Sequence, residues 1–180
     1  MKITNETQLI TSFAARQNSV TAAMHNAGYE ALGVNFVYIP ISTDDIEHAT
    51  AGVRGFKLKG STVAKPHKQT VMKYLDRIDP IARHIGAVNT VSNDNGVLTG
   101  YNSDWIGAMT ALKEVTDLQG KCVIVIGAGG AARAMTYGLV QEKGSVTIFN
   151  RTVDKAKILA KEFGVTFGGE TCCSYNRTRL

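Results

Sequence analysis

Residues 121–132 have the sequence KCVIVIGAGGAA, a continuous apolar run that is followed at once by glycines. Such a run is typical of a strand buried in a parallel sheet, and we expect Cys122 to lie in its core. Gly127 permits a tight turn, and Gly129 lets backbone N–H groups approach a pyrophosphate at the N-terminus of the next helix. The segment therefore predicts a dinucleotide-binding loop, with a merely tight strand-to-helix turn as the alternative. The loop residues expected to contact the cofactor are Gly127, Ala128, Gly129, Gly130 and Ala131.

The residues after this loop continue the alternation of strand and helix. We expect a strand over 121–126, a helix over 130–143, a strand over 145–149, a helix over 152–163 that ends at Gly164, and a short strand over 165–167. This order is a βαβ unit, for which a right-handed crossover is expected.

The end of the second strand of this unit indicates which dinucleotide binds. An NAD site usually places Asp or Glu there, where it accepts a hydrogen bond from the ribose 2′-hydroxyl. This chain has Asn150, Arg151 and Thr152 at that place, and Lys155 follows one turn later. Two cations attract a 2′-phosphate, and they are unfavourable at a helix N-terminus without an anion nearby. The sequence therefore predicts NADP as the cofactor, with a solvated helix start as the alternative.

In the residues before 120, stretches with the hydrophobic periodicity of a helix also alternate with stretches that have the periodicity of a strand. Ser42, with Asp45 three residues later, matches a helix N-cap, and Pro66 suits the first residue of another helix. Residues 94–96 (DNG) form a turn signal between two apolar stretches. The expected elements are strands over 8–13, 35–41 and 58–64, helices over 21–32, from Ser42 to about Arg54, from Pro66 onward and over 103–115, and a hairpin with arms 87–92 and 97–101.

These elements predict an α/β protein. We expect an N-terminal open α/β substrate domain over residues 1–104, a connecting helix and linker over 105–119, and a partial Rossmann-type dinucleotide-binding domain over 120–180. From about residue 168 the sequence has neither helical nor strand periodicity, and we expect an atypical tail there.

Composition excludes several classes of protein. The chain has 180 residues, 44% of them hydrophobic and 19% charged, with a formal charge of +5 and three cysteines, two of them adjacent. These values argue against a disordered tail, a disulfide scaffold and a metal cluster, and the modest, dispersed charge does not favour nucleic-acid binding. Neither a signal peptide nor a membrane span is recognisable, so we expect a cytoplasmic protein that binds a small acidic ligand.

Four segments before residue 105 carry polar side chains at junctions between expected elements. They contain Ser19 and Thr21, Lys68, Asn89 and Asp104. Ligands of open α/β sheets bind where strands end, so a lysine and an aspartate from two such ends could pair there. Each residue also has an ordinary alternative: a surface helix position for Lys68, a turn for Asn89, a helix N-cap for Asp104.

Five motifs together resemble the shikimate dehydrogenase family: GFKLKGSTVAKPHKQ, IGAVNTV, LTGYNSDWIGA, VIGAGGAARA and FNRT. The resemblance implies that the first domain binds shikimate or a quinate-type substrate and that the second binds NADP. It also implies that Lys68 takes the place of the catalytic lysine, Asp104 of its aspartate partner and Asn89 of the substrate-binding asparagine. The family's two serines that contact substrate correspond to Ser19 and Thr21.

The sequence also departs from the family pattern. Ala64 replaces a threonine whose hydroxyl would meet substrate, and Lys65 replaces an aliphatic residue, so we expect an altered pocket. We expect only the first mononucleotide half of the cofactor domain, as in a truncated or frameshifted chain. An NADP-linked shikimate dehydrogenase-like enzyme is therefore the first hypothesis. The other hypotheses are a non-catalytic binding module and a chain with no function of its own. An exposed apolar face would also favour a homo-oligomer.

Overall fold

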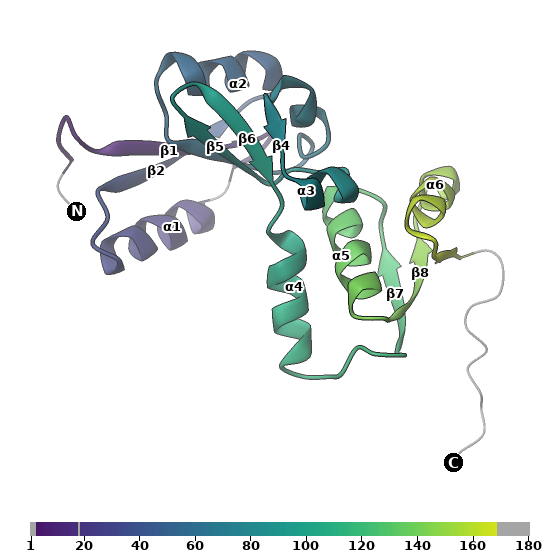
Figure 1. Cartoon of the computed structure of the whole chain (residues 1–180). Coiled ribbons are helices and arrows are strands. Elements are labelled where there is room, and N and C mark those ends of the chain that lie inside the picture. The colour runs from purple at the N-terminus through teal and green to yellow at the C-terminus, as the bar shows by residue number, and fades with distance from the viewer. Residues whose placement is uncertain (1–2, 18, 169–180) are drawn as a thin grey trace, which may run out of the picture. The chain divides into compact units, whose positions relative to one another are not determined.

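The structure is a computed structural model that describes residues 3–17 and 19–168. The chain divides into two compact units, Met1–Asn102 and Ser103–Leu180, and each is described by itself. The first unit therefore ends directly after the hairpin, and the helix expected as a connection belongs to the second unit (Figure 1).

The first unit is built on a six-stranded mixed sheet with the order β2-β1-β3-β5-β6-β4. Its strands are β1 (Gln8–Ala14), β2 (Phe36–Ser42), β3 (Gly60–Val63), β4 (Arg77–Ile78), β5 (Thr90–Asp94) and β6 (Val97–Tyr101). Strands β1, β2 and β3 are parallel, whereas β5 is antiparallel to both β3 and β6. The start of β5 and the ends of β3 and β6 consequently lie at the same edge of the sheet.

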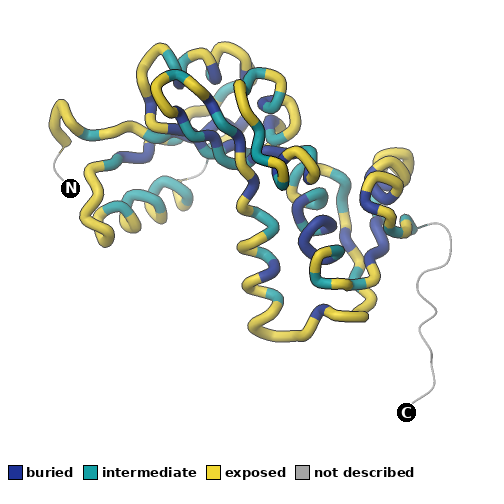
Figure 2. The backbone as a smooth tube through the Cα atoms, in the orientation of Figure 1, coloured by how far each residue is buried: buried dark blue, intermediate teal, exposed yellow. Residues whose placement is uncertain are grey.

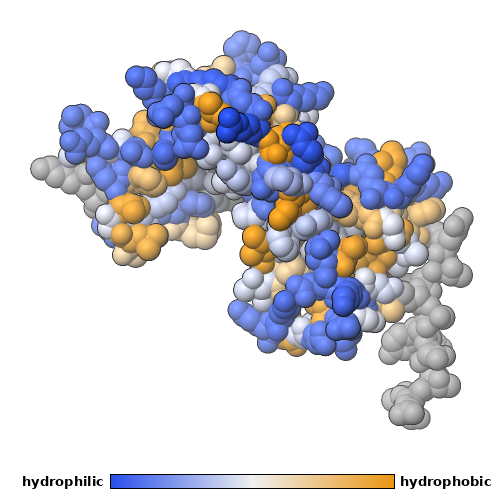
Figure 3. Space-filling model, in the orientation of Figure 1, coloured by the Kyte–Doolittle hydropathy of each residue, from blue (hydrophilic) through white to orange (hydrophobic). Residues whose placement is uncertain are grey.

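Four helical segments accompany this sheet. They are α1 (Ser19–Ala31), α2 (Ile46–Gly55), the 3₁₀ helix η1 (Thr70–Tyr74) and α3 (Pro80–Ile85). The core lies under α2, η1 and α3, where Val53, Val71, Ala82 and Leu98 are fully buried. Helix α1 lies along β2 and has no buried residue, and its apolar side chains Val20 and Met24 are exposed (Figures 2 and 3).

Two local expectations for this unit were wrong. The N-cap of α2 is Asp45 and not Ser42, which ends β2; the Asp45 carboxylate accepts from the His48 N–H at 3.0 Å, and this bond holds the pKa of Asp45 below its usual value. Pro66 does not start a helix, because residues 65–69 form a turn and the 3₁₀ helix starts only at Thr70. The Lys65–Pro66 peptide bond is cis.

Helix α3 was missed although its sequence carries the usual end signals. Asp79 caps it by accepting from the N–H groups of Ile81 and Ala82, and Pro80 is its first residue. Gly86 ends it in the left-handed conformation, with φ of +70°. The hairpin turn was predicted correctly: Asn95 and Gly96 both have positive φ, as a two-residue turn between twisted strands requires.

The described residues of the second unit form a parallel three-stranded sheet with the order β7-β8-β9, together with helices. Its elements are α4 (Asp104–Lys113), β7 (Cys122–Ile126), α5 (Gly130–Gln141), β8 (Ser145–Phe149), α6 (Val153–Phe163) and β9 (Thr166–Phe167). Helix α4 packs on α5, where the ring of Trp105 meets the ring of Tyr137 edge-on at 5.2 Å. The α/β class and the alternating order predicted for this part are confirmed.

Strand β7 differs from the expectation of a fully buried strand. Cys122 is exposed, and Ile124 and Ile126 are 54% and 86% exposed, whereas Val125 on the opposite face is buried. The side chains of β7 alternate between the two faces of the sheet, and the described residues leave the face with Cys122, Ile124 and Ile126 exposed. Among the described residues, only the Val125 face is covered.

Within the described part of the chain, no helix has the length and apolarity needed to cross a lipid bilayer.

Candidate active site

The carboxyl ends of β1 and β3 form the sheet edge at which two of the predicted substrate-site residues, Lys68 and Asn89, lie. Lys68 follows β3 in the turn 65–69, and Asn89 directly precedes β5. Because β5 runs antiparallel to β3, with Thr90 opposite Thr62, the start of β5 reaches the place where β3 ends. Two segments that are distant in sequence therefore meet at one edge.

Backbone hydrogen bonds connect these two segments directly. The Val88 N–H donates to the Lys68 carbonyl at 2.7 Å, and the Val63 N–H donates to the Asn89 carbonyl at 2.7 Å. The Asn89 N–H donates in turn to the Tyr101 carbonyl at 2.9 Å. Lys68 and Asn89 are thus held on neighbouring stretches of backbone, and both side chains are half-buried.

The side chain of Asn89 is oriented by its neighbour in sequence. The Thr90 hydroxyl donates to Asn89 Oδ1 at 2.8 Å. This bond uses one acceptor position of the amide, whose nitrogen is a donor by chemistry. A half-buried amide of this kind is suited to hydrogen bonding with ligand hydroxyl groups.

Two further residues of the quoted motifs fix the backbone of this edge, a role that sequence reasoning did not assign. His67 is 5% exposed, and its Nε2 lies 2.8 Å from the Thr43 carbonyl, which joins the turn after β3 to the loop after β2. Asn102 is 6% exposed and donates from Nδ2 to the Ala87 carbonyl at 2.9 Å. Both side chains are buried and bond to backbone carbonyls that are distant in sequence. A single sequence does not show such burial or such contacts.

Helix α1 carries Ser19 and Thr21 in its first turn, shortly after the carboxyl end of β1. The helix is tied to β2 through Asn26, whose side chain accepts from the Tyr38 N–H at 2.8 Å and donates to the Tyr38 carbonyl at 3.1 Å. The Tyr38 hydroxyl and the Thr62 hydroxyl share a hydrogen bond of 2.6 Å. This network connects α1 to β3, and sequence reasoning did not find it.

Asp104 is the first residue of α4 and belongs to the second unit, two residues after Asn102. A carboxylate in the first turn of a helix interacts favourably with the helix dipole. Its pairing with Lys68 stays a prediction.

The glycine loop of the second unit lies at the carboxyl edge of the three-stranded sheet. Gly127 has φ of +120°, a conformation that favours glycine, and its N–H donates to the Phe149 carbonyl at 2.6 Å. Because β7 pairs in parallel with β8, the loop and residues 150–152 lie beside each other. The predicted pyrophosphate and ribose-phosphate residues therefore meet at one edge.

The N-terminus of α5 fits the phosphate role predicted for it. Gly129 occupies the N-cap position, so no side chain caps the helix, and no acidic residue stands in its first turn. A side chain at Gly129 would project into open space, because nothing lies within 4 Å of the place its Cβ would occupy. The uncapped backbone N–H groups and the space beside them suit an anion.

The residues predicted to read the 2′-phosphate are also accessible. Arg151, Thr152 and Lys155 are exposed, and Asn150 donates from Nδ2 to the Thr152 carbonyl at 2.8 Å, which shapes the start of α6. Thr152 is the N-cap of α6 but makes no side-chain capping hydrogen bond. Two cations beside an uncapped helix start are chemically suited to a phosphate monoester.

No group of three or more potential metal ligands occurs among the described residues.

Comparison with known proteins gives one consistent result. Residues 15–91 match the profile of the shikimate dehydrogenase substrate binding domain, and residues 109–171 match that of shikimate/quinate 5-dehydrogenase. The chain is 40% identical over 156 residues to the shikimate dehydrogenase (NADP(+)) of Methanothermobacter thermautotrophicus, covering 85% of this chain and 55% of that protein.

Two solved structures agree with this result. The shikimate dehydrogenase of Aquifex aeolicus has a TM-score of 0.88 at 37% identity over 92% of this chain and 64% of its own. Shikimate 5-dehydrogenase of Thermus thermophilus was solved in complex with NADP(H) and shikimate. It has a TM-score of 0.80 at 33% identity, over 89% of this chain and 62% of its own. This chain spans less than two thirds of the length of each of these proteins. Since both of its units match the same enzymes in sequence and in fold, the chain belongs to the shikimate dehydrogenase family.

Proposed function

We propose that the protein is a shikimate dehydrogenase-like oxidoreductase that interconverts 3-dehydroshikimate and shikimate, or a quinate-type pair, with NADP. The observation that best supports this proposal is the hydrogen bond from the Val88 N–H to the Lys68 carbonyl, because it holds the backbone of Lys68, our proposed catalytic lysine, beside that of Asn89. A cytoplasmic location is part of the same proposal.

Oxidation of a secondary alcohol requires removal of a proton from oxygen and of a hydride from carbon. When bound, the nicotinamide ring of NADP supplies the hydride acceptor. In the proposal Lys68 takes the hydroxyl proton, and Asp104 is its carboxylate partner. The Asn89 amide, with the hydroxyls of Ser19 and Thr21, orients a small, hydroxylated carboxylate through hydrogen bonds.

The second unit holds the adenosine end of the cofactor in this proposal. The N–H groups at the start of α5, beside Gly127 and Gly129, bind the pyrophosphate. Arg151 and Lys155 bind the 2′-phosphate, which distinguishes NADP from NAD. An uncapped helix N-terminus and exposed cations at one sheet edge support this assignment.

Substrate choice within the family is proposed to follow from Ala64 and Lys65. Ala64 is half-buried directly after β3, and its N–H donates to the Phe13 carbonyl at 2.8 Å. The family has a threonine at this position. A substrate group that hydrogen-bonds to the threonine hydroxyl therefore loses about 1 to 3 kcal/mol of binding free energy in this protein.

A non-catalytic binding module is the second candidate. It is favoured by the observation that the candidate substrate residues and the candidate phosphate-binding residues lie at the carboxyl edges of two separate sheets. Each ligand could therefore bind to its own unit, and a protein that binds both ligands but does not orient the nicotinamide ring would have low turnover.

An assay of NADP reduction at saturating shikimate or quinate tests the proposed activity in the 180-residue polypeptide. Saturable reduction that is lost in Lys68→Ala supports the oxidoreductase. Saturable shikimate binding without reduction supports the binding module, and the absence of both contradicts the two proposals.

A further inference from the structure

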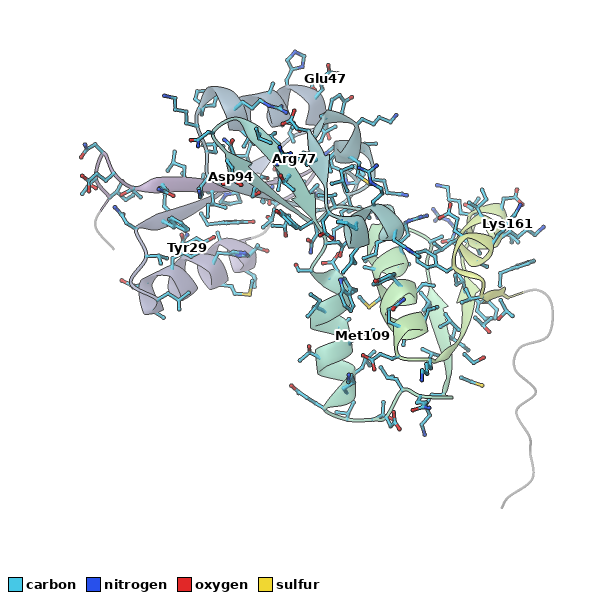
Figure 4. The ribbon with its side chains drawn as sticks, in the orientation of Figure 1. Tyr29, Glu47, Arg77, Asp94, Met109 and Lys161 are labelled. Carbon is cyan, nitrogen blue, oxygen red and sulfur yellow. The ribbon has the colours of Figure 1, made fainter. Side chains whose placement is uncertain are left out.

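A cavity of about 590 Å³ lies in the first unit at the amino ends of β1 and β3. Gln8, the first residue of β1, and Lys59, which precedes β3, line it together with Asp94, the last residue of β5. Figure 4 labels Asp94. Strand β3 runs from Lys59 toward Lys68, so this cavity and the candidate active site occupy opposite ends of the same strand. The cavity is therefore distinct from the substrate site.

The charged residues of the cavity lining are three cations and one carboxylate, and its other five residues are uncharged. Arg54, Lys57 and Lys59 face a single carboxylate of the lining, that of Asp94. Lys59 Nζ lies 3.8 Å from Asp94 Oδ1, which is a loose pairing of two exposed groups. The Lys57 side chain makes no ion pair with any residue that the structure describes. The cavity thus carries an excess of positive charge.

Arg54 is held in place before any ligand arrives. Its Nε donates to the Gly96 carbonyl at 3.1 Å, and its Nη2 donates to Asp76 Oδ2 at 2.8 Å. Asp76 is the second acidic group near the cavity, and it also accepts from the Leu98 N–H at 2.7 Å. A fixed guanidinium loses less conformational entropy on binding than a mobile one.

The walls of the cavity are also joined by a buried amide. Asn93 is 8% exposed; its Nδ2 donates to the carbonyls of Val53 and Leu58, at 3.2 and 2.8 Å. Its Oδ1 accepts from the Gly96 N–H at 2.8 Å. The end of α2, the segment before β3 and the hairpin turn are thereby fixed to one another. The cavity is preformed, as small-molecule sites usually are.

We propose that this cavity is a second ligand site, and that it binds a small organic anion carrying at least two negative charges. Its volume lies in the range of small-molecule sites, about 300 to 1,000 Å³. Arg54 supplies a fixed donor, and Lys57 and Lys59 supply mobile cations that close on the anion. The site does not depend on the proposed oxidoreductase activity.

Nuclear magnetic resonance titration of the isotope-labelled chain with citrate and, separately, with pyrophosphate tests this site. We expect saturable shifts of the backbone amides of residues 54–59 and 93–96, with potassium chloride at the same ionic strength giving none. The two probes distinguish a carboxylate ligand from a phosphate ligand. Shifts at the start of α5 report the nucleotide site separately, so failure there does not affect this result.

The matched variants are Lys57→Gly and Lys143→Gly. Both lysines have positive φ, +51° and +60°, next to the end of a helix, so glycine should preserve or raise the melting temperature in each. We expect Lys57→Gly to weaken citrate or pyrophosphate binding about two- to fivefold and Lys143→Gly to leave it unchanged. Equal weakening by both variants, identical shifts with chloride, or no saturable shift at residues 54–59 would overturn the proposal.

Discussion

Lys68 is the residue on which the proposed chemistry depends most. Replacing it with alanine removes the group that takes the substrate proton, so we expect kcat of an active enzyme to fall at least about a hundredfold. Lys73→Ala, an exposed lysine of the next helical segment, is the control and should keep its turnover. Near-normal turnover in a folded Lys68→Ala protein would remove Lys68 from the mechanism.

Arg151 is expected to set the choice between the two dinucleotides. Its guanidinium is exposed beside the start of α6, where a 2′-phosphate would be bound. Losing one charge-assisted contact costs about 1.5 to 3 kcal/mol, so Arg151→Ala should weaken adenosine 2′,5′-bisphosphate binding roughly tenfold to a hundredfold. Calorimetric titration measures this change. Lys161→Ala, in the last turn of α6, is the control, and equal loss in both variants would contradict the assignment (Figure 4).

Asp76 makes stability depend on pH. The Leu98 N–H and then the Arg54 guanidinium bond its carboxylate, and they hold the pKa of Asp76 below its usual value. The folded-state pKa of Asp76 therefore lies below the unfolded value of about 3.9. The carboxylate's contribution to folding stability is complete above that pH and is lost as pH falls through the folded-state pKa.

Asp76→Asn should consequently unfold at a lower temperature than the natural chain at pH 7, with the difference shrinking below about pH 4. Thermal unfolding followed by circular dichroism from pH 7 to pH 3 checks this. A difference between the two proteins that stays constant over the whole range would show that the Asp76 carboxylate does not contribute.

At the scale of elements, the contact of α4 with α5 depends on a close approach. A Cβ at Gly138 would lie 2.7 Å from Met109 Cγ, and Met109 is buried (Figure 4). Gly138→Ala should therefore destabilise the second unit by about 1 to 3 kcal/mol, although alanine is the better helix former.

In a Met109→Ala background the same substitution should instead stabilise by up to about 1 kcal/mol, because the crowding is gone and the helix propensity remains. Urea denaturation of the four proteins of this double-mutant cycle gives the coupling. Additive effects of the two substitutions would mean that α4 and α5 do not pack through Met109.

Some elements could be predicted from local sequence, and others could not. Strand 145–149 and the helix ending at Gly164 coincide with β8 and α6, because their periodicity and end signals are local. The turn at Pro66 could not be predicted, since the first-turn preference of proline suits a helix equally well. Tertiary contacts keep residues 65–69 out of a helix. The Lys65 carbonyl accepts a hydrogen bond from the Ala15 N–H, and the Lys68 carbonyl accepts one from the Val88 N–H.

At the scale of the whole molecule, Lys68 and Asn89 lie at the carboxyl edge of the first sheet, and the glycine loop and residues 150–152 lie at that of the second. The resemblance to the family predicted roles for Lys68 and Asn89, and those roles stay predictions. Their backbones are neighbours because β5 returns antiparallel to β3. Tyr38 and His67 were not predicted to have a role, because their partners are a distant hydroxyl and a backbone carbonyl. Such contacts exist only after folding.

Calorimetric titration of shikimate into the 180-residue chain, without nucleotide, tests the central claim most directly. We predict saturable binding that Asn89→Ala weakens roughly fivefold to a hundredfold, since a hydrogen bond at a half-buried site is worth about 1 to 3 kcal/mol. Asn5→Ala, which removes an exposed asparagine before β1, is the control and should bind as tightly as the natural chain. Absence of saturable binding, or equal affinity in Asn89→Ala, would contradict the assignment of this sheet edge as the substrate site.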